Sequence, residues 1–334
     1  MFWFDPSIYV CLALLFGIAA QFRAMGGSAS LRRVLAALET KVGLLFAVVV
    51  VACVFSPLVL NDVVVLVLTP VLIAYGGDDP RAVAPLVVAE ITFANIASAL
   101  TPFGNPQNIL LWQASGVSAA AFVARTCWPL ILSGVIAAVT LLPFTSRRAK
   151  RPEERGPITP VLYLCAVAAI ILLGGLFDLP NWASLFIAFA VALPATYRIL
   201  PEMAREFDVK SLVALYAFVS VVAVIAYFAA GRLGDAARAA ASGTQPYSAL
   251  FIGGLSALIG NVPATQLVVS LSSVSHDAAS RLEVQAGLAG NLGPVASFAN
   301  ILALTMLRRA GLPLKRTVLL QVAVGVVAFL PAFL

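Results

Sequence analysis

One stretch of the chain, residues 84–114, is apolar enough to cross a lipid bilayer and yet cannot form one continuous helix. Pro102 and Pro106 flank Gly104 near its middle, and each proline lacks a backbone donor and clashes with the preceding helical turn. Unwound backbone at membrane depth is tolerated only where protein or a water-filled cavity surrounds it. We therefore predict two half-helices joined by an unwound segment, the arrangement from which transporters build ion sites.

The composition places the chain among polytopic membrane proteins. Of its 334 residues, 61% are hydrophobic and 11% are charged, whereas a soluble domain has about 25% charged residues. The net charge of +6 does not indicate nucleic-acid binding, because the basic residues cluster in short loops between apolar segments. One histidine and no cluster of metal ligands leave a membrane-embedded enzyme as a remote alternative. We expect no enzymatic activity, no catalytic residue and no cofactor.

The interrupted pattern occurs twice along the chain. Residues 42–75 and 247–275 are apolar with a polar interruption near the middle, and residues 283–307 carry a second Gly-Pro break like that of 84–114. Paired interruptions of this kind are the best sequence indication of a transporter site. We interpret 42–75 and 247–275 as re-entrant hairpins, with pairs of short spans as the open alternative. The predicted organisation is a first repeat at 1–145, a cytoplasmic linker at 146–157, two connecting spans within 158–207 and a second repeat at 208–334.

Asparagines occupy corresponding places in the two repeats. The pairs are Asn61 with Asn261, Asn95 with Asn291, and Asn108 with Asn300. Further spans are expected at 7–22, 119–143, 159–176, 182–200, 211–229 and 316–334, and separate amphipathic segments at 31–40 and 232–241. Residues 202–210 are expected to form a polar loop, and His276 to lie in an outer loop.

The number of crossings makes the two repeats inverted. Five crossings precede residue 211 if the hairpins do not cross, so the second repeat starts from the opposite face. With residues 23–41 in the cytoplasm, nearly all basic residues fall on the cytoplasmic side, as the positive-inside rule requires. The exceptions are Arg125, Arg232, Arg238 and Arg281. We therefore expect an integral protein of the bacterial inner (plasma) membrane with both termini outside.

These motifs resemble those of the ion transporter superfamily. The resemblance is carried by the hairpin tip Asn61-Asp62, by AEITFANIASALTPFGNPQNILL, and by GNVPA and AGNLGPVASFANILA in the second half. The similar branch contains arsenite permeases, sodium–proton antiporters, citrate transporter-like proteins and anion permeases. The resemblance implies an all-α polytopic membrane protein of inverted repeats, each with a re-entrant helical hairpin and a broken transmembrane helix. It also implies an elevator-like mechanism, in which a transport domain slides against a scaffold.

Two departures from related branches bear on the substrate. Sodium–proton antiporters of this group resemble Gly-Asp-Pro-Pro-Asn at the first break, whereas this chain has an amide, Asn105, in place of the carboxylate. Dicarboxylate carriers resemble Ser-Asn-Thr at both hairpin tips, whereas the tips here read Leu60-Asn61-Asp62 and Gly260-Asn261-Val262. The amide at the break weakens a cation-antiport interpretation, and the hairpin tips weaken a citrate or succinate interpretation.

Two acids, Asp62 and Glu90, lie deep in predicted membrane segments. A charged acid at the bilayer centre costs about 2.5 kcal/mol or more on insertion scales. Burial also disfavours its charged form, which suits a group that takes up and releases a proton. We predict that both acids couple transport to an ion gradient. The structural alternatives are a hairpin-tip cap on the following helix for Asp62 and a hydrogen bond to a neighbouring span for Glu90.

Neutral amides and hydroxyls make up the rest of the predicted site, and no basic residue lies there. The candidate substrate- and ion-binding residues are Asn61, Asp62, Asn95, Ser98, Thr101, Asn105, Asn108, Asn261, Asn291, Ser297 and Asn300. If sodium is the coupling ion, its site is expected near Asn61, Asn95 and Asn105; no other metal is expected.

The sequence thus favours a secondary active transporter of a small inorganic anion or oxyacid of the arsenite type, coupled to protons or sodium. A sodium–proton antiporter is the alternative. The expected partners are the lipid bilayer and a small-ion substrate, without nucleic acid, and a homodimer is left open.

Overall fold

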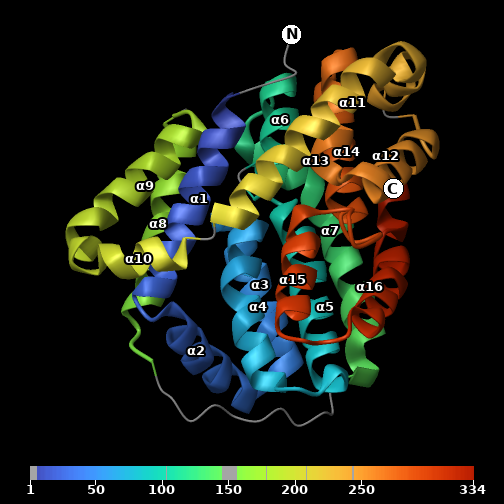
Figure 1. Ribbon diagram of the computed structural model, residues 1–334. Helices are drawn as coiled ribbons and strands as arrows, with labels where there is room; N and C mark the ends of the chain where they lie inside the picture. The colour runs from blue at the N-terminus through green and yellow to red at the C-terminus, as the bar shows by residue number, and fades with distance from the viewer. Residues whose placement is uncertain (1–5, 103, 145–155, 178, 208, 243) are drawn as a thin grey trace.

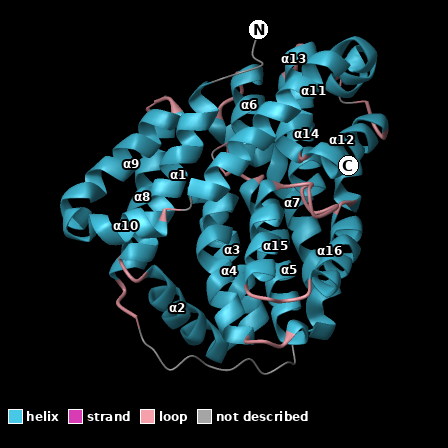
Figure 2. Cartoon of the chain, in the orientation of Figure 1, coloured by secondary structure: helices cyan, strands magenta, loops and turns pink. Residues whose placement is uncertain are grey.

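Every regular element is a helix in the part of the chain that the computed structural model describes, residues 6–102, 104–144, 156–177, 179–207, 209–242 and 244–334 (Figures 1 and 2). The helices of the first half are α1 (Pro6–Ala24), α2 (Gly27–Val42), α3 (Leu44–Val59), α4 (Asn61–Gly76), α5 (Pro80–Ser98), α6 (Pro106–Ser115), α7 (Ala119–Leu141) and the short 3-10 helix η1 (Leu142–Phe144). The connecting helices are α8 (Thr159–Leu176), α9 (Asn181–Thr196), η2 (Tyr197–Ile199) and α10 (Leu200–Glu206). The second half contains α11 (Val209–Ala241), α12 (Tyr247–Ile259), α13 (Asn261–Leu271), α14 (His276–Ala289), α15 (Phe298–Arg309), α16 (Leu314–Ala328) and η3 (Leu330–Phe333).

The helices have the length and surface of a membrane protein. Among the described residues, three helical stretches are long and apolar enough to cross a bilayer: Pro80–Ser98, Ala120–Phe144 and Leu314–Phe333. Large apolar side chains also face outward, such as Phe228 and Leu258, which are 77% and 76% exposed. Such a surface is unfavourable in water and suits lipid. The chain is therefore an all-α polytopic membrane protein, as the sequence predicts.

The two interrupted apolar segments form helical hairpins with buried tips. Arms α3 and α4 have 16 residues each, which corresponds to about 24 Å, less than the ~30 Å of a hydrocarbon core. Arms α12 and α13 are shorter still. The tips turn at Leu60 and Gly260, whose φ angles are 70° and 91°. Leucine rarely adopts this conformation, and Leu60 is only 4% exposed, so its packing must offset the strain.

Both predicted helix breaks are present. Helix α5 ends at Ser98 and α6 begins at Pro106, while α14 ends at Ala289 and α15 begins at Phe298. In Figure 1, hairpin α3–α4 lies in the lower half of the molecule with α5 and α15, whereas hairpin α12–α13 lies in the upper half with α6 and α14. Each hairpin packs on the half-helix of the other repeat, α4 on α15 and α13 on α6. The repeats are thus inverted relative to one another.

Three local predictions are wrong. The segments 211–229 and 232–241 are one continuous helix, α11, whereas their first-half counterparts α1 and α2 bend by 75°. The bend occurs at Gly26, which has a left-handed φ of 84°. In α11 the two glycines of the corresponding region, Gly231 and Gly234, both lie within the helix, which tolerates each at a cost of about 1 kcal/mol.

The other two errors are missed helix starts. His276 is the first residue of α14 and does not lie in a loop, because the Ser275 side chain caps the helix by accepting from the Ala278 N–H. Residues 202–210 are not simply a polar loop, since α10 begins at Leu200 with Pro201 and Glu202 in its first turn. Serine caps, early prolines and early acids are ordinary signals of a helix N-terminus.

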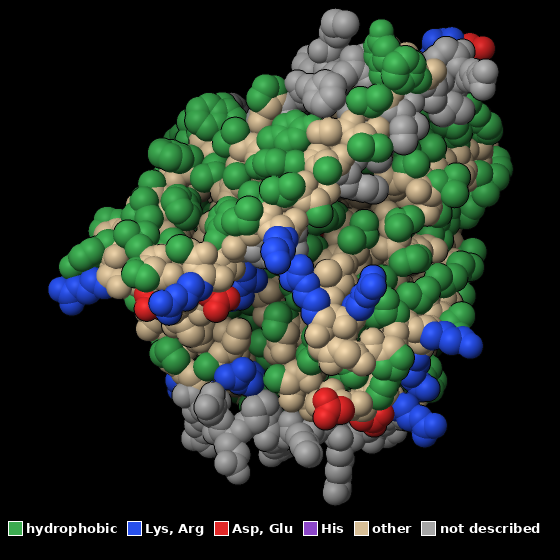
Figure 3. Space-filling view, viewed as in Figure 1, with side chains coloured by type: hydrophobic (Ala, Val, Ile, Leu, Met, Phe, Trp, Pro, Cys, Tyr) green, Lys and Arg blue, Asp and Glu red, His purple; other side chains and the backbone are tan. Residues whose placement is uncertain are grey.

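The hairpins and broken helices form the centre of the molecule. Helices α1, α8, α9 and α10 lie to one side of it, and α11 crosses its face (Figure 1). The connections α4–α5 and α15–α16 both lie at the lower end (Figure 1). Figure 3 shows Lys and Arg gathered mainly in the lower half of the visible face, and hydrophobic side chains over most of the remainder.

Helix α16 lies directly against the second break, and this contact gives a test of the packing. A Cβ at Gly325 would lie 2.0 Å from the Asn291 carbonyl oxygen, whereas a Cβ at Gly254 would meet nothing within 4 Å. We expect Gly325→Ala to destabilise the protein by about 1–3 kcal/mol through overpacking, and Gly254→Ala to leave its stability unchanged or slightly higher. Thermal unfolding in detergent would measure both, and equal stability of the two variants would contradict the packing described.

Candidate functional site

The hairpin tips are bonded to the helix breaks by one backbone hydrogen bond in each repeat. The Asn61 N–H donates to the Gly104 carbonyl at 3.1 Å, and the Asn261 N–H donates to the Ala296 carbonyl at 2.9 Å. Each bond therefore joins a hairpin tip to the helix break of its own repeat.

One asparagine in each repeat satisfies the unwound backbone of its own break. Each side-chain amide donates to two carbonyls, ten and seven residues earlier in the chain. The bonds run from Asn108 Nδ2 to Ser98 O and Thr101 O, both at 2.7 Å, and from Asn300 Nδ2 to Gly290 O at 2.6 Å and Gly293 O at 2.9 Å. Buried carbonyls without such partners would cost about 1–3 kcal/mol each, so the predicted correspondence of these two asparagines has a clear physical basis.

Asn95 joins the two repeats. Its carbonyl oxygen accepts from Asn61 Nδ2 at 2.9 Å. Its amide nitrogen lies 3.0 Å from Asn291 Oδ1 and 3.1 Å from Asn300 Oδ1. Asn261 Nδ2 reaches the same point, because a Cβ at Gly290 would lie 3.2 Å from both Asn261 Nδ2 and Asn95 Cγ. Five of the predicted asparagines therefore form one cluster, called the asparagine cluster below: Asn61, Asn95, Asn261, Asn291 and Asn300.

The other predicted polar residues surround the asparagine cluster. The Ser98 hydroxyl donates to the Asn95 carbonyl at 3.1 Å, and the partly exposed Thr101 donates to the Pro57 carbonyl at 2.5 Å. Asn105 and Ser297, which are 2% and 1% exposed, stand at the N-caps of α6 and α15. All of these lie within or beside the two breaks.

The two predicted acids are buried and differ in their partners. The Asp62 carboxyl accepts a hydrogen bond from the backbone N–H of Ala299, in the first turn of α15. Glu90 is fully buried, and one of its oxygens accepts from the Thr69 hydroxyl at 2.8 Å while the other has no partner. Asp62 thus bonds to the first turn of α15, a helix of the other repeat, whereas the structural alternative was a cap on the helix that follows it, α4.

Sequence reasoning missed a third buried acid, Glu283. It is 0% exposed, and neither of its carboxyl oxygens has a hydrogen-bond partner. The expected start of the broken helix at 283 placed this acid at a membrane surface, whereas α14 begins seven residues earlier and carries it inward. Gln107 was missed as well; it is 0% exposed, and both polar atoms of its amide lack partners. The Ser275 cap was the signal that would have moved Glu283 inside.

Helix ends converge on the asparagine cluster in two sets. Helices α4, α6, α13 and α15 begin there, and α3, α5, α12 and α14 end there. A helix N-terminus presents free N–H groups and a partial positive charge, and a C-terminus presents carbonyls and a partial negative charge. The centre therefore offers donors suited to an oxyanion and carbonyls suited to a cation.

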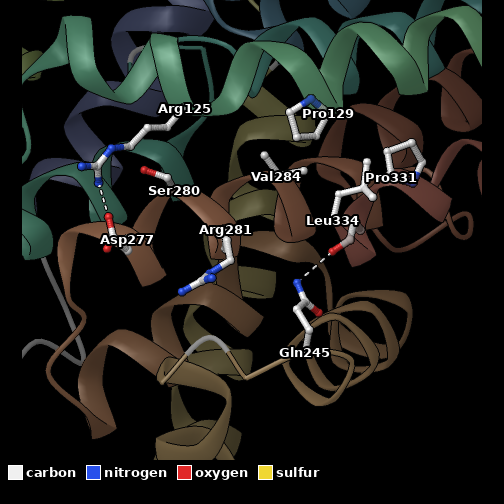
Figure 4. Close-up of a pocket in the computed structure, with 10 residues that line it drawn as sticks. Arg125, Pro129, Gln245, Asp277, Ser280, Arg281, Val284, Pro331 and Leu334 are labelled. Carbon is white, nitrogen blue, oxygen red and sulfur yellow. Dashed lines mark hydrogen bonds and ion pairs between the residues drawn. The ribbon is translucent and has the colours of Figure 1, made fainter.

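A separate cavity of about 340 Å³ lies between α7, α14 and the C-terminal residues. Figure 4 shows Ser280, Arg281 and Val284 of α14 around it, and Arg125 of α7 paired with Asp277. The Arg125–Asp277 distance is 2.7 Å, and their side chains are 42% and 76% exposed. This cavity differs from the asparagine cluster in being basic and in reaching the surface.

Comparison with known proteins agrees with this architecture. A family model described as "Citrate transporter", CitMHS, matches residues 1–289. The chain belongs to the CitMHS citrate transporter family.

Individual relatives of this CitMHS chain are also membrane proteins or transporters by name. It is 29% identical to the inner membrane protein YbiR of Escherichia coli over 291 residues, 82% of this chain and 72% of YbiR. It is 27% identical to the uncharacterized transporter MJ0456 of Methanocaldococcus jannaschii, over 75% of this chain and 67% of that protein. It is 34% identical to the silicon efflux transporter LSI3 of Oryza sativa over 92 residues, 28% of this chain and 19% of LSI3. The protein is a membrane transporter and not an enzyme.

The central position of Asn95 gives a second test. We expect Asn95→Leu to destabilise the protein by about 3 kcal/mol or more, because it leaves buried amide groups of three asparagines unpaired at about 1–3 kcal/mol each. Ser133→Ala is the control, since it removes one buried hydrogen bond, 2.6 Å to the Ala328 carbonyl, and should cost about 1 kcal/mol. Denaturant unfolding in detergent would compare the two, and equal losses would mean that Asn95 does not link the repeats.

Proposed function

We propose that this CitMHS protein is a secondary active transporter of a small inorganic oxyacid or singly charged anion of the arsenous or silicic acid class. The observation that carries the proposal is the makeup of the centre. Asparagine amides and four helix N-termini meet there, and the described residues of the two hairpin tips and the two breaks include no Lys, Arg or His. Amides and backbone N–H groups bind hydroxyls and oxygens without requiring a full negative charge.

The charge of the site distinguishes small oxyacids such as arsenous or silicic acid from citrate, the acid in the family name. Citrate carries several carboxylates, and helix N-termini supply only about half a positive charge each. Carriers of planar carboxylates would be expected to use an arginine fork. A hydroxylated oxyacid such as silicic acid can bind to amides and backbone N–H groups without an arginine in the site. The relative LSI3 is named for silicon efflux.

Unpartnered polar atoms beside the asparagine cluster supply binding capacity. Asn61 Oδ1, Asn105 Nδ2 and Asn261 Nδ2 are buried without a hydrogen-bond partner. A donor or acceptor left unpaired in a dry interior is unfavourable by about 1–3 kcal/mol, so a hydroxylated substrate that bonds to these atoms gains that free energy. These atoms and the predicted residues of both breaks form the proposed binding site.

Coupling is assigned to the buried acids Asp62 and Glu90. Asp62 is bonded to the first turn of α15, so a change in its protonation or a bound sodium ion alters the contact between hairpin α3–α4 and the second break. Glu90 has one unpartnered oxygen for a proton or cation. Buried carboxyls beside carbonyl-rich helix C-termini also suit a sodium–proton antiporter, which is the second candidate function.

The arrangement of helices supports an elevator-like mechanism. The hairpins and broken helices would move as a transport domain along the flanking helices α1, α8 and α9. Arg23 of α1 reaches across that boundary, donating to the Leu66 carbonyl of α4 at 3.4 Å. The name of YbiR favours the bacterial inner membrane. The position of Lys and Arg in the lower half favours an orientation with the lower end of Figure 1 in the cytoplasm and both termini outside. A homodimer is compatible with this arrangement.

Transport by Asp62→Asn in membrane vesicles tests the function. We expect wild-type protein to accumulate arsenous or silicic acid under a proton or sodium gradient. Asp62→Asn should lower gradient-driven accumulation about tenfold or more and retain exchange without a gradient, because the amide keeps the shape of the carboxyl but cannot change its charge. Asp78→Asn, at an exposed loop position, is the matched control and should behave as wild type.

The same assay distinguishes the alternatives. Salt-dependent proton movement without uptake of any oxyacid would replace the proposal by sodium–proton antiport. Gradient-driven accumulation unchanged in Asp62→Asn would remove Asp62 from the coupling role.

A further inference from the structure

Of the three buried acids Asp62, Glu90 and Glu283, Glu283 is the one whose carboxyl receives no hydrogen bond. Asp62 has a helix N-terminus and Glu90 has a hydroxyl, but neither oxygen of Glu283 has a hydrogen-bond partner. A bare carboxylate in a dry interior costs several kcal/mol, whereas the neutral acid costs far less. The surroundings of Glu283 therefore favour the protonated side chain.

The Glu283 carboxyl faces the first helix break. Its Oε1 would lie 3.7 Å from a Cβ at Gly287, one turn further along α14. The same Cβ would lie 2.4 Å from Ala99 Cβ, and Ala99 is the C-cap of α5, where the unwound segment begins. Only glycine at 287 allows this close approach, so the face of α14 that carries Glu283 and Gly287 packs directly against the start of the break.

Glu283 does not itself line the basic cavity, but three residues of α14 within one turn of it do: Ser280, Arg281 and Val284. Val284 follows Glu283 directly, Ser280 precedes it by one turn, and both face the cavity of about 340 Å³ shown in Figure 4. The exposed Arg125–Asp277 pair stands at the same cavity. Glu283 thus lies next in the chain to residues that line a surface cavity, while its carboxyl lies near the start of the unwound segment of the first repeat.

We propose that Glu283 is a proton-carrying residue that connects this cavity to the central site, in addition to Asp62 and Glu90. In the uptake step a carboxylate oxygen of Glu283 forms an O–H bond with a proton from hydronium in the cavity, which leaves water. In the release step this O–H bond breaks, and a water molecule at the first break takes the proton and becomes hydronium. This inference rests on the proposed transport function and deepens it, because it makes the proton a coupling ion.

Charged side chains of both signs and a hydroxyl group line the cavity. Arg125 and Arg281 line it together with Asp277, which pairs with Arg125. Protons pass along water and hydroxyl groups, and the Ser280 hydroxyl lines the cavity one helical turn before Glu283. Helix α6, which packs on α14, carries no ionisable residue in Pro106–Ser115.

Other charged or titratable groups lie on α14 and on the helices that pack against it. Helix α14 itself carries His276, Asp277 and Arg281, and the helices packed on it carry Tyr247 (α12), Arg125 and Cys127 (α7), Arg81 and Glu90 (α5), Lys315 and Arg316 (α16), and Lys210, Tyr216, Tyr227, Arg232, Asp235 and Arg238 (α11). No hydrogen bond joins any described member of this set to Glu283. Helix α13 and η3 carry none.

Infrared difference spectroscopy of the purified protein tests the inference without a substrate. Wild-type protein taken through a pH change should show a carbonyl-stretch band of a protonated carboxyl that is missing in Glu283→Gln. Glu283→Asp, which keeps a carboxyl, and Glu202→Gln, at an exposed position of α10, should both retain it. A band unchanged in Glu283→Gln would overturn the proposal.

A labelling experiment on wild-type protein serves if the variants fail to fold. A hydrophobic carbodiimide reacts with protonated carboxyls in apolar surroundings, and peptide mapping should place the adduct at Glu283. Label at Asp62 or Glu90 without label at Glu283 would overturn the proposal.

A transport assay is the third test of the proposal. In proteoliposomes, Glu283→Gln should lower proton-driven accumulation of arsenous or silicic acid about tenfold or more while substrate exchange continues. Full accumulation by Glu283→Gln would refute the proton role and leave the transport function standing. Absence of any oxyacid flux by wild-type protein would refute the transport function, whereas the infrared and labelling results would still judge Glu283.

Discussion

The structure depends on one constraint: backbone that leaves a helix inside a membrane must find its hydrogen-bond partners within the protein. Two helices break and two hairpins turn at the same depth, and the exposed N–H and C=O groups have no water to bond with. Asn108 and Asn300 cover the carbonyls of the two breaks, and the backbone of each hairpin tip bonds to a break. These amide and backbone hydrogen bonds are therefore the condition for having interrupted helices at all.

Satisfying the backbone also creates the site. The asparagines that complete the breaks present their remaining atoms to the same point at which helix N-termini and C-termini meet. Donors and carbonyls are then available for a small oxyacid and a coupling ion, without a charged side chain that would fix the sign of the ligand. Folding and binding in this protein rest on the same residues.

The repeats share this amide framework but not their acids. Asp62 at the first hairpin tip corresponds to Val262 at the second. Counted eight residues back from the paired Asn291 and Asn95, Glu283 corresponds to Val87, which is also buried. The backbone hydrogen bonds thus follow the pseudosymmetry, while the carboxyls break it. Because corresponding positions of the two repeats carry a carboxyl in one repeat and an apolar side chain in the other, the two sides of the membrane can differ in the ion that couples to transport.

Sequence patterns anticipated the interruptions better than the helix boundaries. Prolines and glycines such as Pro106 and Gly260 act locally, so the breaks and the hairpin tips could be located from them. The contact between Asn61 and Asn95, by contrast, depends on how four segments pack, and only their shared polarity hinted at it. Glu283 was missed because its depth depends on where α14 starts, and the Ser275 cap that sets this start looked like one serine among several in a polar loop.

The most direct test of the account is to locate a heavy oxyacid in the protein. Antimonous acid shares the hydroxylated, uncharged chemistry of arsenous acid, and antimony can be located by its anomalous scattering in crystals. The account predicts an antimony peak among the first turns of α4, α6, α13 and α15, beside Asn61 and Asn105. A peak confined to the basic cavity at Arg125 and Arg281, with none beside the asparagine cluster, would contradict it.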